Sequence, residues 1–219
     1  MANISAAAVK ALRDQTGAPM GQCKQALVES DGIADKALEW LQKKSAATAE
    51  KKSGRSAVEG RVDAYIHHDG RTGVVMEVNC ETDFAAGTDD FIQLVRDLCM
   101  QVAAMSPKYV ASDEISAAEL AHQREIFEAQ ARELGKPEAV LPRIVDGKVA
   151  AWYGDVCLLD QAFVKDEKGR KVRQILTERI AKIGENIVVR RFARFELGDG
   201  LEKKADDFAD EVARMAGQA

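Results

Sequence analysis

The chain has 219 residues, of which 46% are hydrophobic and 31% charged, and its formal net charge at pH 7 is −5. This composition is typical of a globular protein and excludes the disordered and fibrous classes. The acidic balance also argues against a general nucleic-acid binder, because such proteins concentrate Lys and Arg on the face that meets the phosphates.

No segment of the sequence predicts export or membrane insertion. The N-terminal stretch MANISAAAVKALRDQTG lacks a basic region followed by a long apolar run. No later window approaches about 18 uncharged apolar residues, which a spanning helix needs. The cysteines are widely separated, which favours reduced, small hydrophobic side chains over a disulfide framework. We therefore expect a cytoplasmic protein without membrane contacts, whose four cysteines are Cys23, Cys80, Cys99 and Cys157.

Residues 1–43 predict a compact domain of three short helices. Apolar residues recur there at helical spacing, and Ser5 is a plausible cap for the first helix. Turn-forming residues at 16–19 and 30–32 separate the helices. The three apolar stripes are Ile4, Val9 and Leu12; Met20, Cys23, Leu27 and Val28; and Ile33, Ala37, Leu38 and Leu41.

Residues 44–58 predict a linker. The stretch KKSAATAEKKSGRSA, residues 43–57, contains no large apolar side chain, so it covers little core whether it is helical or flexible. The basic residues between Lys43 and Arg55 leave RNA binding open as an alternative function. Because charge runs are mostly solvated segments, we favour a linker over an RNA-binding patch.

Residues 59–198 predict an α+β core. Residues 60–66 and 72–78 have the alternation of two strands, and the turn between them contains His67 and His68. Residues 91–105 follow with helical spacing, and Ser106-Pro107 ends that helix. A helix packed on an antiparallel hairpin gives an α+β layer.

A helical segment at about 113–180 is inserted in this core. It contains a polar helix of roughly residues 116–134, a shorter helix over 137–152 and an irregular apolar stretch at 155–165. The anchors that we expect for the polar helix are Leu120, Ile126, Phe127 and Leu134.

The last elements are a helix, a strand and a helical tail. Lys171 to Ile183 again has helical spacing, and Ile187 to Glu196 alternates as a strand that pairs with the hairpin. Residues 199–219 predict a C-terminal helical tail with an apolar stripe, formed by Leu201, Ala205, Phe208, Val212 and Met215.

The segment EVNCETDF, residues 77–84, has three possible interpretations: a catalytic cluster, a metal site or a surface for another protein. The chain has no CxxC, HExxH, GxxxxGK[ST] or GxGxxG motif, so we expect neither a metal nor a bound cofactor. The adjacent His67 and His68 point to opposite faces of an extended turn and cannot easily chelate together. Cys80 lacks an evident base, and the neighbouring Glu81 raises a thiol pKa rather than lowering it. We therefore expect that the protein is not an enzyme.

Phe84 is the informative residue of this segment. Thr82 and Asp83 have helix-capping chemistry, so a helix that begins near Phe84 would place the ring at its edge. The ring is then either displayed to solvent or tucked inward as a hydrophobic staple, and periodicity does not decide between the two.

Two long motifs carry a family resemblance. LRDQTGAPMGQCKQAL, residues 12–27, and EVNCETDF together resemble both motifs of the bacterial translation elongation factor Ts family, and IAKIGENIVVRRFARFEL, residues 180–197, looks like the end of that family's core. Only one copy of the hairpin motif is present, so the chain resembles the short form with a single core subdomain. The resemblance implies an α+β fold with a ubiquitin-associated-like three-helix domain before an antiparallel sheet.

The function that the resemblance implies is guanine-nucleotide exchange without a cofactor. The partner is elongation factor Tu, bound both with GDP and without nucleotide. The Thr82-Asp83-Phe84 turn inserts into the partner's GTPase domain and dislodges the magnesium ion, so that GDP leaves. Ala85 stands where the family usually has Val, which makes the apolar edge beside Phe84 smaller. The residues implied for docking on the GTPase domain are Arg13, Thr16, Gly17, Met20 and Lys24.

The resemblance also implies a homodimer, to which the 110–180 region or the terminal strand contributes. His67 or His68 is a possible further contact with elongation factor Tu. The alternative function, from another class, is a ubiquitin-associated-type interaction domain attached to a thiol enzyme that uses Cys80.

Overall fold

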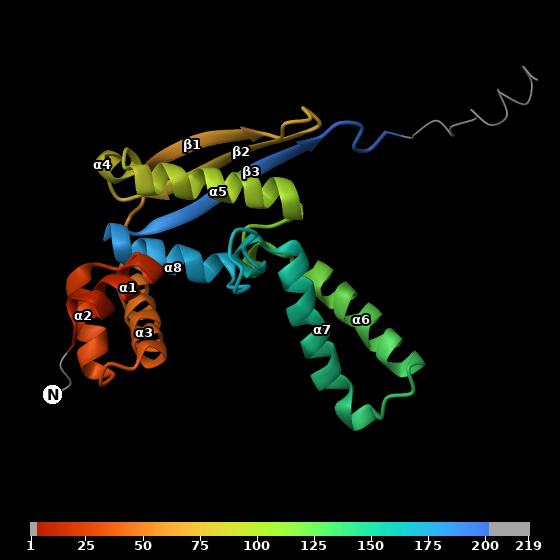
Figure 1. Ribbon diagram of the computed structural model, residues 1–219. Coiled ribbons are helices and arrows are strands. Elements are labelled where there is room, and N and C mark those ends of the chain that lie inside the picture. The colour runs from red at the N-terminus through yellow and green to blue at the C-terminus, as the bar shows by residue number, and fades with distance from the viewer. Residues whose placement is uncertain (1–3, 202–219) are drawn as a thin grey trace, which may run out of the picture.

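The computed structural model describes residues 4–201, and its centre is a three-stranded antiparallel sheet (Figure 1). The strand order is β1 (Glu59–Ile66), β2 (Thr72–Cys80) and β3 (Ile187–Glu196). The register pairs Glu59 with Cys80 and Cys80 with Ile187, and it shifts at Glu77/Val78. The predicted hairpin, the final strand and the α+β fold class are therefore confirmed.

One face of the sheet carries the main core. The helix α5 (Asp89–Met105) packs on β1 and β2, and α8 (Val172–Ile183) lies beside α5 and leads into β3 (Figure 1). Thr88 caps α5 by accepting a hydrogen bond from the Phe91 amide. The buried side chains of this core include Val74, Met76, Val78, Phe91, Leu94, Leu98, Leu158 and Val172.

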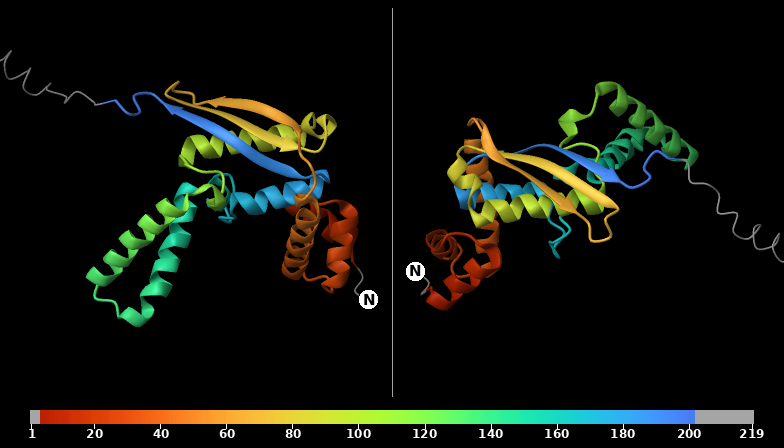
Figure 2. Two further views of the ribbon diagram at one scale, coloured as in Figure 1. Left: turned by 180° about the vertical axis from the view of Figure 1, so that it is seen from behind. Right: turned by 90° about the horizontal axis from the view of Figure 1, so that it is seen from above.

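The opposite face of the sheet is not covered by any helix of the described residues (Figure 2). Strand side chains alternate between faces, so the residues that flank the buried ones point outward. The exposed apolar residues on this face are Val62, Ile66, Val75, Val188 and Phe195. We call these five side chains the open sheet face.

The N-terminal domain consists of α1 (Ala6–Thr16), α2 (Met20–Glu29) and the first part of α3 (Ala34–Ser53), and it has its own small core. Ser5 caps α1 as expected, because its side chain accepts a hydrogen bond from the Ala8 amide. The predicted apolar stripes are wrong at three positions: Met20 is 54% exposed, and Val28 and Ile33 are also exposed. So small a domain cannot enclose every apolar residue at its helix ends.

Helix α3 continues to Ser53 and so includes residues 44–53 of the predicted linker. Alanine-rich sequence favours helix, and small side chains let two helices approach closely. Here α3 lies against α8, and Ala49 packs on the main core. Of the two forms that the sequence left open, this part of the linker is therefore helical, and it is packed on the core.

Two helices, α6 (Ala117–Glu133) and α7 (Leu141–Val156), form an antiparallel arm that projects from the core (Figure 1, Figure 2). The helix expected over 137–152 begins later, because a 3-10 turn (Glu138–Val140) follows Pro137. Two of the expected anchors are wrong, since Ile126 and Leu134 are exposed. The arm is closed instead by the buried residues Ala131, Leu141, Val145 and Val149.

The segment between the arm and α8 contains the 3-10 turn η3 (Leu158–Asp160) and is tied to α5 by two buried glutamines. Gln101 donates to the Gln161 side chain over 3.1 Å and accepts from the Val164 amide over 2.8 Å. These bonds hold an otherwise irregular stretch, as expected for buried polar groups. A further turn, η1 (Ser112–Glu114), precedes the arm.

The predicted C-terminal helix lies almost entirely outside the described residues, which end at Leu201. No helix within residues 4–201 is long and apolar enough to cross a membrane.

Candidate functional site

The end of the β-hairpin displays an aromatic ring. After β2 ends at Cys80, Thr82 caps the four-residue helix α4 (Asp83–Ala86) by accepting a hydrogen bond from the Ala85 amide over 3.2 Å. Phe84 is 85% exposed, so the ring is not a buried staple. Ala85, the next residue, is only 4% exposed in the chain alone.

The turn before α4 is held by a carboxylate about a hundred residues away in sequence. Glu185 accepts hydrogen bonds from the backbone amides of Glu81 and Thr82, over 3.1 and 3.0 Å, and from the Thr82 hydroxyl over 2.7 Å. In return, the Glu81 carboxylate accepts a hydrogen bond from the backbone amide of Asn186 over 2.7 Å. This reciprocal pair of bonds joins the end of β2 to the start of β3.

The Glu81 carboxylate is stabilised in its charged form. The hydrogen bond from the backbone amide of Asn186 lowers the pKa of Glu81 most. Slight burial raises this pKa, and Arg55 lowers it through an ion pair of 3.3 Å. Glu81 is therefore occupied by structural bonds, and nothing in its surroundings prepares it for proton transfer.

Cys80 has the properties of a structural thiol. Its side chain is fully buried, and its Sγ donates a hydrogen bond to the Thr82 carbonyl over 3.1 Å. Burial raises the pKa of the Cys80 thiol, and the nearby charge of Glu185 raises it further. A reactive cysteine needs exposure and a lowered pKa. The structure thus gives no support to the thiol-enzyme alternative.

The candidate docking residues gather around the end of α1 and the start of α2. Gly17 ends α1 in the left-handed conformation, with φ of 67°, and its amide bonds to the Arg13 carbonyl. The Thr16 hydroxyl donates to the Leu12 carbonyl over 2.7 Å, so it closes the same helix end. Met20 and Lys24 are exposed on α2. These residues form a surface around a rigid turn.

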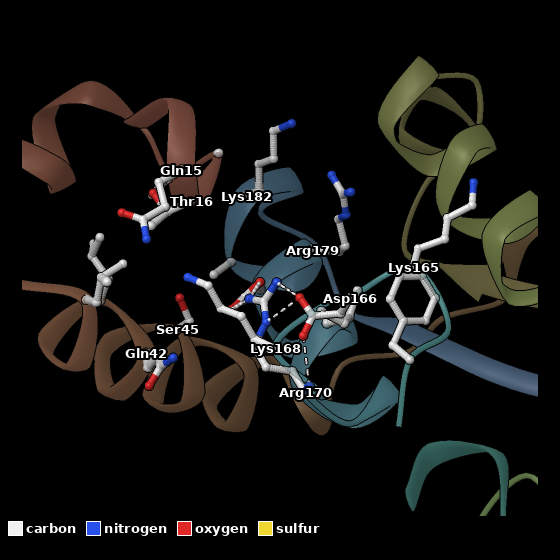
Figure 3. Close-up of a pocket in the computed structure, with 18 of the residues that line it drawn as sticks. Gln15, Thr16, Gln42, Ser45, Lys165, Asp166, Lys168, Arg170, Arg179 and Lys182 are labelled. Atoms are coloured by element: carbon white, nitrogen blue, oxygen red, sulfur yellow. Dashed lines mark hydrogen bonds and ion pairs between the residues drawn. The ribbon is translucent and has the colours of Figure 1, made fainter. Parts of the chain in front are cut away.

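A cleft of about 590 Å³, lined by both polar and apolar side chains, lies between this turn and α8 (Figure 3). Its lining includes Thr16 and Gly17 from the turn, and Lys168, Arg179 and Lys182 from the region 163–182. Two of these cations, Arg179 and Lys182, pair with Asp90. Arg170, which also lines the cleft, pairs with both Asp166 and Glu178 over 2.6 Å. The cleft is not predictable from sequence, because the 163–182 region lies far from the turn along the chain.

The two histidines of the hairpin are at the end of the sheet opposite to Phe84 (Figure 1). The Tyr65 hydroxyl and the His67 Nδ1 are 2.9 Å apart, and the rings of His67 and His68 contact each other edge-on. The structure therefore does not bring the histidines together with the other candidate residues. The N-terminal domain and α4, in contrast, lie at the same end of the molecule (Figure 1, Figure 2).

The basic residues between 43 and 55 are largely engaged within the chain. Lys44 lies over the Trp40 ring and donates to Gln25. Lys52 donates to the Gly184 carbonyl, and Arg55 pairs with Glu81. A surface that reads RNA phosphates needs free cations, so these contacts weaken the RNA-binding alternative. Within residues 4–201, no group of three or more His, Cys, Asp or Glu side chains is placed to hold a metal ion.

Comparison with known proteins gives one consistent result. The family model described as elongation factor TS matches residues 8–176. The chain is 54% identical to elongation factor Ts of Anaeromyxobacter dehalogenans (strain 2CP-1 / ATCC BAA-258) over 217 residues, which cover 99% of both chains. It is 51% identical to elongation factor Ts of Desulforamulus reducens, over 97% of this chain and 98% of that protein. It is also 51% identical to elongation factor Ts of Geobacter sulfurreducens, over 98% of this chain and 99% of that protein.

Proposed function

Because the chain belongs to the elongation factor Ts family, whose role is nucleotide exchange in translation elongation, we propose that it binds elongation factor Tu with GDP and expels the nucleotide by inserting the Phe84 turn. The observation that carries this proposal is the 85% exposure of Phe84 on a turn whose backbone is fixed by Glu185. An exposed ring on a fixed turn is suited to enter an apolar site on a partner.

The energy for insertion comes from burying the ring. Full burial of a Phe side chain is worth about 1.5–3 kcal/mol relative to leaving it exposed. In our proposal, Thr82, Asp83 and Phe84 enter the GTPase domain, Ala85 supports the turn from beneath, and the shift in the partner dislodges the magnesium ion that bridges the nucleotide phosphates to protein.

Docking is assigned to the N-terminal domain. Arg13, Thr16, Gly17, Met20 and Lys24 surround one rigid turn and lie at the same end of the molecule as α4 (Figure 1). Contact through this surface would hold the GTPase domain while the ring enters it. The exposure of Met20 supports this role, because a large apolar side chain outside the core is suited to a partner surface. One of the hairpin histidines is proposed as a further contact.

Exchange of this kind needs no catalytic acid and no cofactor. The factor must bind the state without nucleotide better than the GDP state, and each 1.4 kcal/mol or so of that difference shifts the balance about tenfold. By reciprocity, rebinding of nucleotide expels the factor. The factor thus binds both the GDP-bound and the nucleotide-free partner; we place it in the cytoplasm, with neither nucleic acid nor membrane as a partner.

We further propose that the protein is a homodimer that pairs through the open sheet face. Ile66 and Phe195 are each about two-thirds exposed and flank Gly73 in the paired strands. Exposed apolar side chains gathered on one face of a sheet favour an interaction site, and the ion pair of Glu77 with Arg191 lies among them. Two such faces from two copies can pack as a sandwich, to which the terminal strand β3 would contribute.

The exchange role is tested by stopped-flow release of fluorescent GDP from elongation factor Tu. The wild-type protein should accelerate release, and Phe84→Ala should reduce the acceleration by about tenfold to a hundredfold, because the ring's burial energy is lost. Leu134→Ala is the matched control, since Leu134 is also a large exposed apolar residue but lies at the tip of the arm. A Phe84→Ala protein as fast as the wild type would contradict the proposed role of the ring.

A further inference from the structure

The loop Gly184–Asn186 connects three parts of the chain. The Glu185 carboxylate accepts three hydrogen bonds from Glu81 and Thr82, which directly precede α4. A helix of four residues has almost no hydrogen-bond ladder of its own, and isolated short helices are marginal in water. The direction of α4 therefore depends on these bonds and on the buried Ala85 and Ala86.

The same loop also holds the end of α3. The Asn186 side chain is buried and donates to the Arg55 carbonyl over 2.9 Å, and Lys52 donates to the Gly184 carbonyl. Helix α3 begins within the N-terminal domain. One loop of three residues thus contacts both the end of α3, the helix that begins in the N-terminal domain, and the turn that carries Phe84.

We infer that Glu185 is a positioning residue, which fixes the direction of the Phe84 ring relative to the N-terminal domain. This inference rests on the proposed function of the Phe84 turn. The exposed ring has little packing of its own, so only the backbone beneath it sets its direction. Fixing that backbone before the partner arrives avoids the ordering cost that a mobile turn would incur on insertion.

The test measures the rate of GDP release against the concentration of the factor. Glu185→Ala should lower the maximal rate about tenfold, because bonds to a charged acceptor are lost, while the half-saturating concentration, set by docking, changes little. Glu185→Asp, which keeps the charge on a shorter side chain, should have a maximal rate between those of the wild type and Glu185→Ala. Glu114→Gln is the control, since Glu114 also accepts a backbone hydrogen bond, from Val110, but lies beside the arm.

A double variant separates positioning from general damage to the fold. If Glu185 acts through Phe84, then Glu185→Ala should cause no further loss in a Phe84→Ala background. An equal loss in both backgrounds, or a Glu185→Ala protein as fast as the wild type, would overturn the inference. If the alanine variant does not fold, the release rate is measured for Glu185→Asp in the wild-type and Phe84→Ala backgrounds instead. A wild-type protein that does not accelerate GDP release refutes the proposed function, whereas a wild type that depends on Phe84 but not on Glu185 refutes the positioning role alone.

Amide hydrogen exchange gives a readout independent of the partner. In the free protein, Glu185→Ala should speed exchange at the Glu81 and Thr82 amides, which lose their acceptor, and leave the amides within α5 as slow as in the wild type. Unchanged exchange at Glu81 and Thr82 would contradict the inference.

Discussion

Phe84 and Ala85 are neighbours in sequence but face opposite environments. Their side chains differ in direction because successive residues of a helix are rotated by about 100°. The sequence could predict the cap at Thr82, since hydroxyl residues favour that position. It could not decide whether Phe84 is displayed or tucked inward, because that depends on how much of the turn the main core covers. The structure answers this question through the burial of Ala85 and Ala86.

The Glu81 carboxylate should contribute to the free energy of unfolding in a way that is lost in acid. Its pKa is lowered from 4.5, first by the Asn186 amide and then by Arg55. Because the folded state binds the proton more weakly than the unfolded state, the contribution is present above the ordinary pKa and is lost as the pH falls through the folded value. Glu81→Gln should be less stable than the wild type at neutral pH, and this difference should shrink on acidification. Urea unfolding at several pH values measures it.

Glu114→Gln is the control, because the Glu114 carboxylate accepts a backbone hydrogen bond from Val110 and has neither Asn186 nor Arg55 as a partner. A stability difference for Glu81→Gln that stays constant from neutral pH to well below pH 4.5 would contradict the assigned cause.

At the scale of elements, strands and helices with strong periodicity were predictable from sequence. The predicted strands lie within one or two residues of β1, β2 and β3, because alternation and turn residues are local signals. The arm was less predictable. Its long helix has apolar residues at several faces, and only the position of α7 determines that Ala131 rather than Leu134 is buried. Local periodicity carries no information about which partner helix is present.

We expect that only glycine fits at position 60, near the start of β1. Gly60 has φ of 143°, and a Cβ there would be 2.2 Å from the Val78 carbonyl oxygen and 2.6 Å from the Asn79 Cα. Both atoms belong to the backbone of β2, so they cannot move aside cheaply. Gly60→Ala should reduce the free energy of unfolding by about 1–3 kcal/mol or more, as overpacking and backbone strain combine. Urea unfolding gives the value.

Gly147→Ala in α7 is the matched control for this substitution. Apart from its chain neighbours and the backbone of its own helix, no heavy atom lies within 4 Å of its added Cβ, and alanine favours helix, so we expect equal or slightly higher stability. If Gly60→Ala were as stable as Gly147→Ala, the close approach of β1 to β2 would not have the proposed cost.

At the scale of the whole molecule, the contacts that matter most join segments far apart in sequence. Glu185 bonds to Thr82 across 103 residues, and Asn186 bonds to Arg55 across 131. The contact of Glu185 with the Thr82 turn is not predictable from sequence, because no spacing rule links a carboxylate to a turn so distant. The same holds for the cleft between the N-terminal domain and α8.

The open sheet face predicts the oligomeric state of the whole molecule. If two copies pack through this face, a charge placed on it must be buried away from water, which is strongly unfavourable. Phe195→Glu should therefore convert a dimer into a monomer at micromolar concentrations, as measured by multi-angle light scattering. Leu134→Glu, which places the same charge at the tip of the arm, should leave the dimer intact. A wild-type protein with the mass of a single chain would contradict dimerisation. A Phe195→Glu protein that remains dimeric would instead place the contact elsewhere, since the exposed ring could not then lie in a dry interface.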